Sequence, residues 1–213
     1  MLTIADYIRR MPAQSSVSQF CNGATQAIRR RYRKDCLDHL ALHPEDRLTA
    51  SCIVFSRLRR EIWMVGDCQC FVDGCHYDNP KPYEQELAEA RAAIIAASPK
   101  PWDHFLTDDT ARQAIIPRML QTMRQQNLTY SVVDGFPVAH SHVRTITLSF
   151  QPCDIVLASD GYPFLCPTLA ESERRLEEQR IADPLNIQAF KATKAFARGY
   201  NSFDDRAYIR FKA

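Results

Sequence analysis

The sequence contains no apolar run that approaches the roughly 18 residues a membrane-spanning helix needs. Its N-terminal segment carries Asp6, Arg9 and Arg10 and lacks the long apolar core of a secretory signal. We therefore expect a cytoplasmic protein with no membrane partner.

The sequence also lacks a strong excess of either charge, since its formal net charge is +2. One basic segment, residues 29–34, falls at the C-terminal end of a predicted helix, where the helix dipole favours positive side chains. Nucleic-acid sites usually combine basic residues with an aromatic or glycine-rich segment, and no such segment accompanies this one. We therefore expect no nucleic-acid partner.

Internal repeats, low-complexity tracts and interdomain linkers are absent as well. The 213 residues, of which 46% are hydrophobic, can bury a sizeable core, and this length suits one domain better than two. We expect a single domain over residues 1–213. The eight cysteines need not be paired in a reducing compartment, where cysteine behaves mostly as a small buried hydrophobe.

Apolar residues at steps of three and four, together with caps and stops, predict the helices. Ser15 and Ser16 precede the first clear amphipathic segment, and Thr168 with Glu171 reads as a capping box. Pro117 is expected to kink or restart the helix that contains it. The predicted helices span residues 17–28, 83–97, 107–126, 168–182 and 187–197.

Segments rich in β-branched and aromatic residues, separated by turn residues, predict the strands. The predicted strands span residues 48–55, 61–72, 129–133, 144–150, 155–158 and 207–211. The first two form a hairpin, and the second, interrupted at Gly66 and Asp67, has apolar residues on both faces. These elements predict an α+β fold of two packed, mostly antiparallel sheets flanked by helices.

Two carboxylates stand at the ends of predicted strands. The segment Asp154–Gly161 is a short apolar strand that ends in Asp160, followed by a glycine that lets a ligand approach the backbone. Asp204 and Asp205 stand just before the last strand, so antiparallel pairing of the two strands would bring Asp160 and Asp204 to one rim. Oxygen ligands suit Mg²⁺ or Mn²⁺, although a simple strand-ending turn would give the same pattern around Asp160.

Four segments resemble motifs of one known family, and the last two of them also fit in order and separation. A strand pair ends in Gly66–Cys68, where the family has Gly-Asp-Ser, and Asp78–Pro82 is a loosened form of an Asp-His-Lys-Pro segment. Leu157–Gly161 reads Leu-Ala-Ser-Asp-Gly, and Asp204–Ala207 matches an acidic segment before the terminal strand. Together they resemble the PP2C-type metal-dependent protein phosphatases, also called the PPM family.

The resemblance implies that Asp160 and Asp204 bind a binuclear Mg²⁺ or Mn²⁺ centre and that Asp78 binds an additional metal ion. The family completes the centre with an acidic residue and an Asp-Gly-His-Gly-type segment. Residues 1–11 resemble the helix that follows this segment in the family, so we expect the missing ligands upstream of Met1. The implied fold is the family's αββα sandwich without its opening strands. Without those strands, sheet edges and apolar faces would be exposed, so we expect marginal stability or self-association.

The implied activity is hydrolysis of a phosphomonoester, as in protein serine/threonine phosphatases, by a water that bridges two metal ions. The substrate would be a phosphorylated protein or a small phosphoester. Because the ligand set is incomplete, we expect weak or single-metal binding and little activity. The chain is then either a truncated form of an active enzyme or, alternatively, a catalytically silent PP2C-like binding or regulatory module.

Cysteine and histidine side chains offer other interpretations. One cluster holds candidate zinc ligands, namely Cys68, Cys70, Cys75 and His76. The spacing lacks the two-residue gap of a zinc knuckle, so buried or edge cysteines are favoured. His140 and His142 share a face of a predicted extended segment without an evident third ligand, which favours exposed or hydrogen-bonded histidines. A reactive thiol at Cys68 is disfavoured by the adjacent Asp67 carboxylate.

Overall fold

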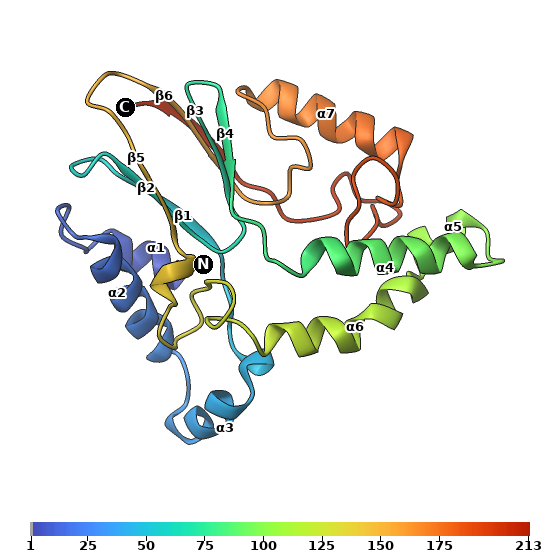
Figure 1. Ribbon diagram of the computed structural model, residues 1–213, viewed down its shortest axis with the longest axis horizontal. Helices are drawn as coiled ribbons and strands as arrows, with labels where there is room; N and C mark the ends of the chain where they lie inside the picture. The colour runs from blue at the N-terminus through green and yellow to red at the C-terminus, as the bar shows by residue number, and fades with distance from the viewer. Residues whose placement is uncertain (1) are drawn as a thin grey trace.

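The computed structural model describes residues 2–213 and has an α+β architecture in which two antiparallel sheets are flanked by helices (Figure 1). The helices are α1 (Leu2–Ile8), α2 (Val17–Arg29), α3 (Leu37–Leu42), α4 (Glu84–Ala97), α5 (Trp102–Thr107), α6 (Thr110–Met123) and α7 (Leu169–Ala182). The strands are β1 (Cys52–Ser56), β2 (Glu61–Val65), β3 (Gln69–Val72), β4 (Cys75–Asp78), β5 (Arg144–Thr147), β6 (Asp154–Ala158) and β7 (Tyr208–Lys212). Short 3₁₀ turns span Lys34–Cys36, Pro44–Asp46 and His140–His142. Among residues 2–213, no helix has the length and apolarity needed to cross a membrane.

The first sheet has the strand order β1-β2-β5 and the second has the order β4-β3-β6-β7, with antiparallel neighbours throughout. The predicted hairpin is confirmed, since β1 pairs with β2 and Cys52 lies opposite Val65. The predicted strand 61–72 is split into β2 and β3, which belong to different sheets. The interruption at Gly66 and Asp67 is therefore the point where the chain crosses between the sheets.

Side chains along β2 alternate between two cores. Ile62 and Met64 pack between the sheets, together with Cys70 of β3 and Ile155 of β6. Trp63 points to the opposite face and joins the core beneath α1 and α2. Both faces of the first sheet are thus covered, as the alternation predicts.

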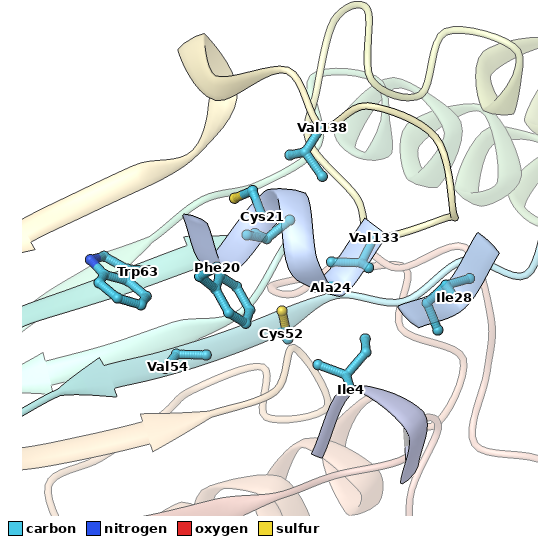
Figure 2. Close-up of a cluster of buried hydrophobic side chains, with 11 residues drawn as sticks. Ile4, Phe20, Cys21, Ala24, Ile28, Cys52, Val54, Trp63, Val133 and Val138 are labelled. Atoms are coloured by element: carbon cyan, nitrogen blue, oxygen red, sulfur yellow. The ribbon is translucent and has the colours of Figure 1, made fainter. Parts of the chain in front are cut away.

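The core beneath α1 and α2 combines helix, strand and loop residues (Figure 2). Phe20 of α2 stacks on Trp63, with ring centroids 5.7 Å apart. The helix begins where the sequence predicts, because Ser16 caps it and exchanges hydrogen bonds with Gln19 in a capping box. The helix that the resemblance implies in residues 1–11 corresponds to α1, and the predicted helix 17–28 corresponds to α2, both on the outer face of the first sheet.

The outer face of the second sheet is covered by the segment that follows β6. Tyr162 and Leu165 pack there against Val156 and Ala158 of β6. The Tyr162 hydroxyl donates to Glu173 of α7 at 2.7 Å, and Figure 1 shows α7 on this side of the sheet. Helices therefore flank the pair of sheets on both sides.

A buried arginine ties α4 to α6 and to the loop that follows α7. The Arg91 guanidinium is fully buried and pairs with Asp109, with Nη2 and Oδ2 2.7 Å apart. It also donates to the carbonyl oxygens of Leu185 (2.7 Å) and Ala192 (3.2 Å). This anchoring positions the irregular segment 183–206, which forms part of the candidate site.

The remaining helix predictions are confirmed with adjusted bounds. The predicted helix 107–126 corresponds to α6, which begins after the N-cap Asp109, whereas the short helix α5 before it was not predicted. The helix does not restart at Pro117, since α6 continues through this residue. α7 begins after Thr168, whose hydroxyl accepts a hydrogen bond from the Glu171 amide at 3.2 Å, which is one half of the predicted capping box.

The predicted strand 129–133 is wrong. Only isolated bridges occur there, one between Val133 and Ala50 and one between Tyr130 and Gln126. Residues 130–133 are nevertheless buried, so the segment contributes side chains to the interior without forming a ladder.

The predicted helix 187–197 is also wrong. The buried Asp183 carboxylate accepts hydrogen bonds from the backbone amides of Ile187 (2.9 Å) and Gln188 (2.7 Å). Asn186 adopts a left-handed backbone conformation with φ +53°. A side-chain acceptor and a left-handed residue together favour a turn over a helix.

Candidate functional site

The predicted convergence of two strand ends is found at one rim of the second sheet. β6 and β7 are antiparallel neighbours, and Ala158 lies opposite Tyr208. Asp160 follows β6 and Asp204 precedes β7, and both line a cavity of about 540 Å³, which we name the outer cavity. Asp78, at the end of β4, lines the same cavity. All three predicted metal ligands therefore face one space.

The carboxyl of Asp160 has a raised pKa. Its side chain is open to the cavity, yet the surrounding walls remove much of its water, and this desolvation raises its pKa. The carboxylates of Asp67 and Asp204 raise the pKa of Asp160 further, Lys81 opposes them, and the result is about 6. An acid in this state gains from any cation that enters the cavity.

Asp67 lies behind Asp160 and is buried and fully engaged. The Ser51 hydroxyl donates to Asp67 Oδ1 at 2.5 Å, and the Lys81 ammonium pairs with Oδ2. Burial alone would raise the pKa of Asp67, but the charge and hydrogen bond of Lys81 and the hydrogen bond from Ser51 outweigh it and lower the pKa. Asp67 is thus an ionised carboxylate that already has a cation.

Glu84, the first residue of α4, completes this acidic group. Its Oε1 lies 3.5 Å from Lys81 Nζ. Loss of water raises the pKa of Glu84, Lys81 opposes the rise, and the carboxylates of Asp67 and Asp160 add to it, giving about 7. Lys81 therefore pairs with both Asp67 and Glu84, and its charge also lowers the pKa of Asp160.

The other two predicted ligands also have basic partners. The Lys194 ammonium lies 2.6 Å from Asp204 Oδ2. Asp78 is exposed, and its Oδ1 lies 3.8 Å from Arg144 Nη1. Lys194 belongs to the segment that Arg91 anchors. This anchoring helps to hold the lysine beside Asp204, at the start of β7.

These donors do not fit a two-metal centre. Within residues 2–213, no group of three or more His, Cys, Asp or Glu side chains is arranged to hold a metal ion. Five carboxylates line the outer cavity, but those of Asp67, Asp78, Glu84 and Asp204 already lie within 4 Å of a lysine or arginine. The ends of β6 and β7 bring two of the five together, Asp160 and Asp204. Mg²⁺ retains several waters in protein sites, so two carboxylates suit at most one partly hydrated ion.

The zinc interpretation finds no support in the part of the chain that the structure describes. Cys68 and Cys70 are buried, whereas Cys75 is exposed on the β4 side, and the cysteines are free thiols. Burial, together with Cys52 and Asp67, raises the pKa of Cys68 well above its usual value, which disfavours a reactive thiolate.

The expected extended face of His140 and His142 is wrong, because both residues lie in a 3₁₀ turn. His140 Nδ1 lies 3.2 Å from the Ser18 hydroxyl, and His142 Nε2 lies 3.0 Å from the Leu128 carbonyl oxygen. Both histidines are therefore hydrogen-bonded, which is one of the two arrangements that the sequence favoured over a two-histidine metal site.

Sequence reasoning missed four charged members of the site, Asp67, Lys81, Glu84 and Lys194. The first three lie within or beside the family-like segments, so the motif pattern contained a signal for them. Lys194 had no such signal, since its segment was predicted as a helix. Comparisons with protein-family models, curated proteins and solved structures give no match for this chain.

Proposed function

We propose that this protein is a PP2C-like domain that binds a divalent cation and a phosphomonoester in the outer cavity, with weak phosphatase activity. The observation that carries the proposal is the pairing of Asp160 and Asp204 on one cavity by antiparallel β6 and β7. The α+β fold with two antiparallel sheets between helices is compatible with an αββα sandwich of this family.

Asp160 and Asp204 would hold the cation, Mg²⁺ or Mn²⁺. When bound, such an ion polarises phosphoryl oxygens and lowers the pKa of a coordinated water. Lys81 holds Asp67 in its ionised form, and its positive charge offsets part of the repulsion between the carboxylates of Asp67 and Asp160. Lys194 must leave Asp204 before that carboxylate can accept an ion, and its ammonium is then available to a phosphoryl oxygen.

The lysine pairs also favour the second candidate function, a catalytically silent binding or regulatory module. Lys81 and Lys194 already neutralise Asp67 and Asp204, and a protonated amine does not activate water as a metal ion does. The same cavity can then bind a phosphorylated partner without hydrolysing it.

Hydrolysis of para-nitrophenyl phosphate with and without Mn²⁺ tests the proposal. We expect slow, Mn²⁺-dependent hydrolysis by the wild type and a loss of about tenfold or more in Asp160→Ala, since the retained carboxylate cannot hold the ion alone. The exposed Asp103→Ala serves as a matched control and should match the wild type. Equal rates for the wild type and Asp160→Ala contradict the enzyme proposal, and phosphoester binding without hydrolysis supports the silent module.

A further inference from the structure

A second cavity of about 230 Å³, which we name the inner cavity, adjoins the outer one. The two cavities share wall residues at their junction, namely Lys81, Glu84, Asp160, Thr193, Lys194 and Asp204. The candidate site therefore lies at the junction of the two cavities, and the proposed function uses only the outer one.

On the side away from the junction, the inner cavity is lined mainly by apolar and aromatic side chains, namely Tyr83, Leu87, Met119, Met123 and Tyr130. Two polar side chains, Thr49 and Gln126, also belong to this wall. The rings of Tyr83 and Tyr130 meet edge to face with centroids 5.3 Å apart. Flexible methionines beside aromatic rings form a wall that adapts to a planar apolar body.

The junction side of the inner cavity is charged and balanced. Lys81, Arg112 and Lys194 provide three positive groups against the carboxylates of Glu84 and Asp160 and that of Asp204. Arg112 is held in place because its Nη1 donates to the Thr193 carbonyl oxygen at 2.8 Å. A divalent cation and a phosphoryl dianion that enter together leave this balance unchanged.

We infer that the inner cavity binds the organic part of the ligand, and that the ligand is a small phosphomonoester with one compact aromatic or apolar group. This inference rests on the proposed function, because the phosphoryl group must occupy the junction. An apolar cavity of about 150 Å³ is large enough to bind benzene, so the inner cavity accommodates one substituted ring. A folded phosphoprotein would place only a side chain there.

Titration calorimetry with two phosphonates, which cannot be hydrolysed at their P–C bond, tests this inference. Phenylphosphonate and methylphosphonate carry the same anionic group and differ in the ring. In the presence of Mn²⁺, we expect the wild type to bind phenylphosphonate about tenfold or more tightly than methylphosphonate, because the ring is buried. Equal affinities, or binding of neither compound, overturn the inference.

Two variants of α6 locate the ring. Met123→Trp fills the inner cavity and should abolish the preference for phenylphosphonate, whereas Leu120→Trp, on the exposed side of the same helix, should retain it. A preference that survives in a folded Met123→Trp protein contradicts the assignment. Should Met123→Trp fail to fold, the wild-type comparison of the two phosphonates still decides.

The metal dependence separates the inference from the proposed function. A ring preference that persists in EDTA supports the inner cavity and contradicts the metal-dependent function. Mn²⁺-dependent binding of both phosphonates with equal affinity supports the function and overturns the inference. A phosphoserine peptide that binds more tightly than phenylphosphonate also overturns it, in favour of a protein substrate.

Discussion

At the scale of single residues, the fold opposes the ionisation of Asp160. Its pKa is raised to about 6 in the folded protein, against about 3.9 in an unfolded chain. Between these values the folded state binds more protons, so the stability contributed by this group falls as the pH rises from about 4 to 6 and stays low above that range. Glu84, with a pKa of about 7, acts in the same direction.

Asp160→Asn should therefore stabilise the metal-free protein at pH 7.5 and change little at pH 4. We expect a rise in melting temperature of about 1–3 °C at the higher pH. Melting curves in EDTA across this pH range measure the effect, and Asp103→Asn, an exposed acid paired with Arg198, is the control. A destabilised Asp160→Asn at pH 7.5 would contradict the electrostatic description.

At the scale of elements, the crossing from β2 to β3 depends on Gly66. Its φ is +84°, and a Cβ at this position would collide with the Ser51 hydroxyl, which is engaged with Asp67. Gly74, in the turn between β3 and β4, has the same φ but nothing within 4 Å of such a Cβ. Comparing alanine substitutions at these two positions therefore distinguishes the cost of backbone strain from the cost of a steric collision.

Gly74→Ala should cost about 1–2 kcal/mol through its backbone conformation alone. Gly66→Ala should cost about 1–3 kcal/mol more, because the collision adds to the strain. Urea denaturation of both variants gives the two free energies of unfolding. Equal losses would mean that Ser51 can move aside and that its hydrogen bond to Asp67 is not rigid.

The layer of α4 and α6 depends on the buried Arg91. Arg91→Ala leaves Asp109 without its partner and frees the segment that carries Lys194, so we expect a loss of about 3–5 kcal/mol in the free energy of unfolding. Arg118→Ala removes an exposed pair with Glu86 on the same layer and should cost at most about 1 kcal/mol. Similar losses for both variants would contradict the anchoring role of Arg91.

Local sequence signals predicted most elements and the pairing of the site's two strand ends. The side-chain alternation in residues 61–65 and 207–211 and the helix cap at Ser16 involve only residues close in sequence. They can therefore be recognised without knowledge of the fold. The segment 187–197 was not predictable in this way, because its turn depends on the buried carboxylate of Asp183 and on contacts with α4. The pairing of Lys194 with Asp204 depends on that turn and was missed for the same reason.

At the scale of the whole molecule, self-association stays a prediction, and an edge strand is where we expect it to occur. β7 lies at the edge of the second sheet, and its Ile209 is exposed. Unpaired edges invite pairing with another chain, although Arg210 and Lys212 on this strand oppose it. Sedimentation velocity over a concentration series should show a growing dimer fraction, and a stable monomer with a high melting temperature would contradict the prediction.

Mn²⁺ binding followed by electron paramagnetic resonance tests the central claim most directly. Asp160 and Asp204 predict one Mn²⁺ per chain, with an affinity that falls by about tenfold or more in Asp160→Asn and in Asp204→Asn, since each removes one of two charged ligands. Asp103→Asn should bind as the wild type does. A wild type that binds no Mn²⁺, or two site variants that bind it unchanged, would contradict the claim that these strand ends form a cation site.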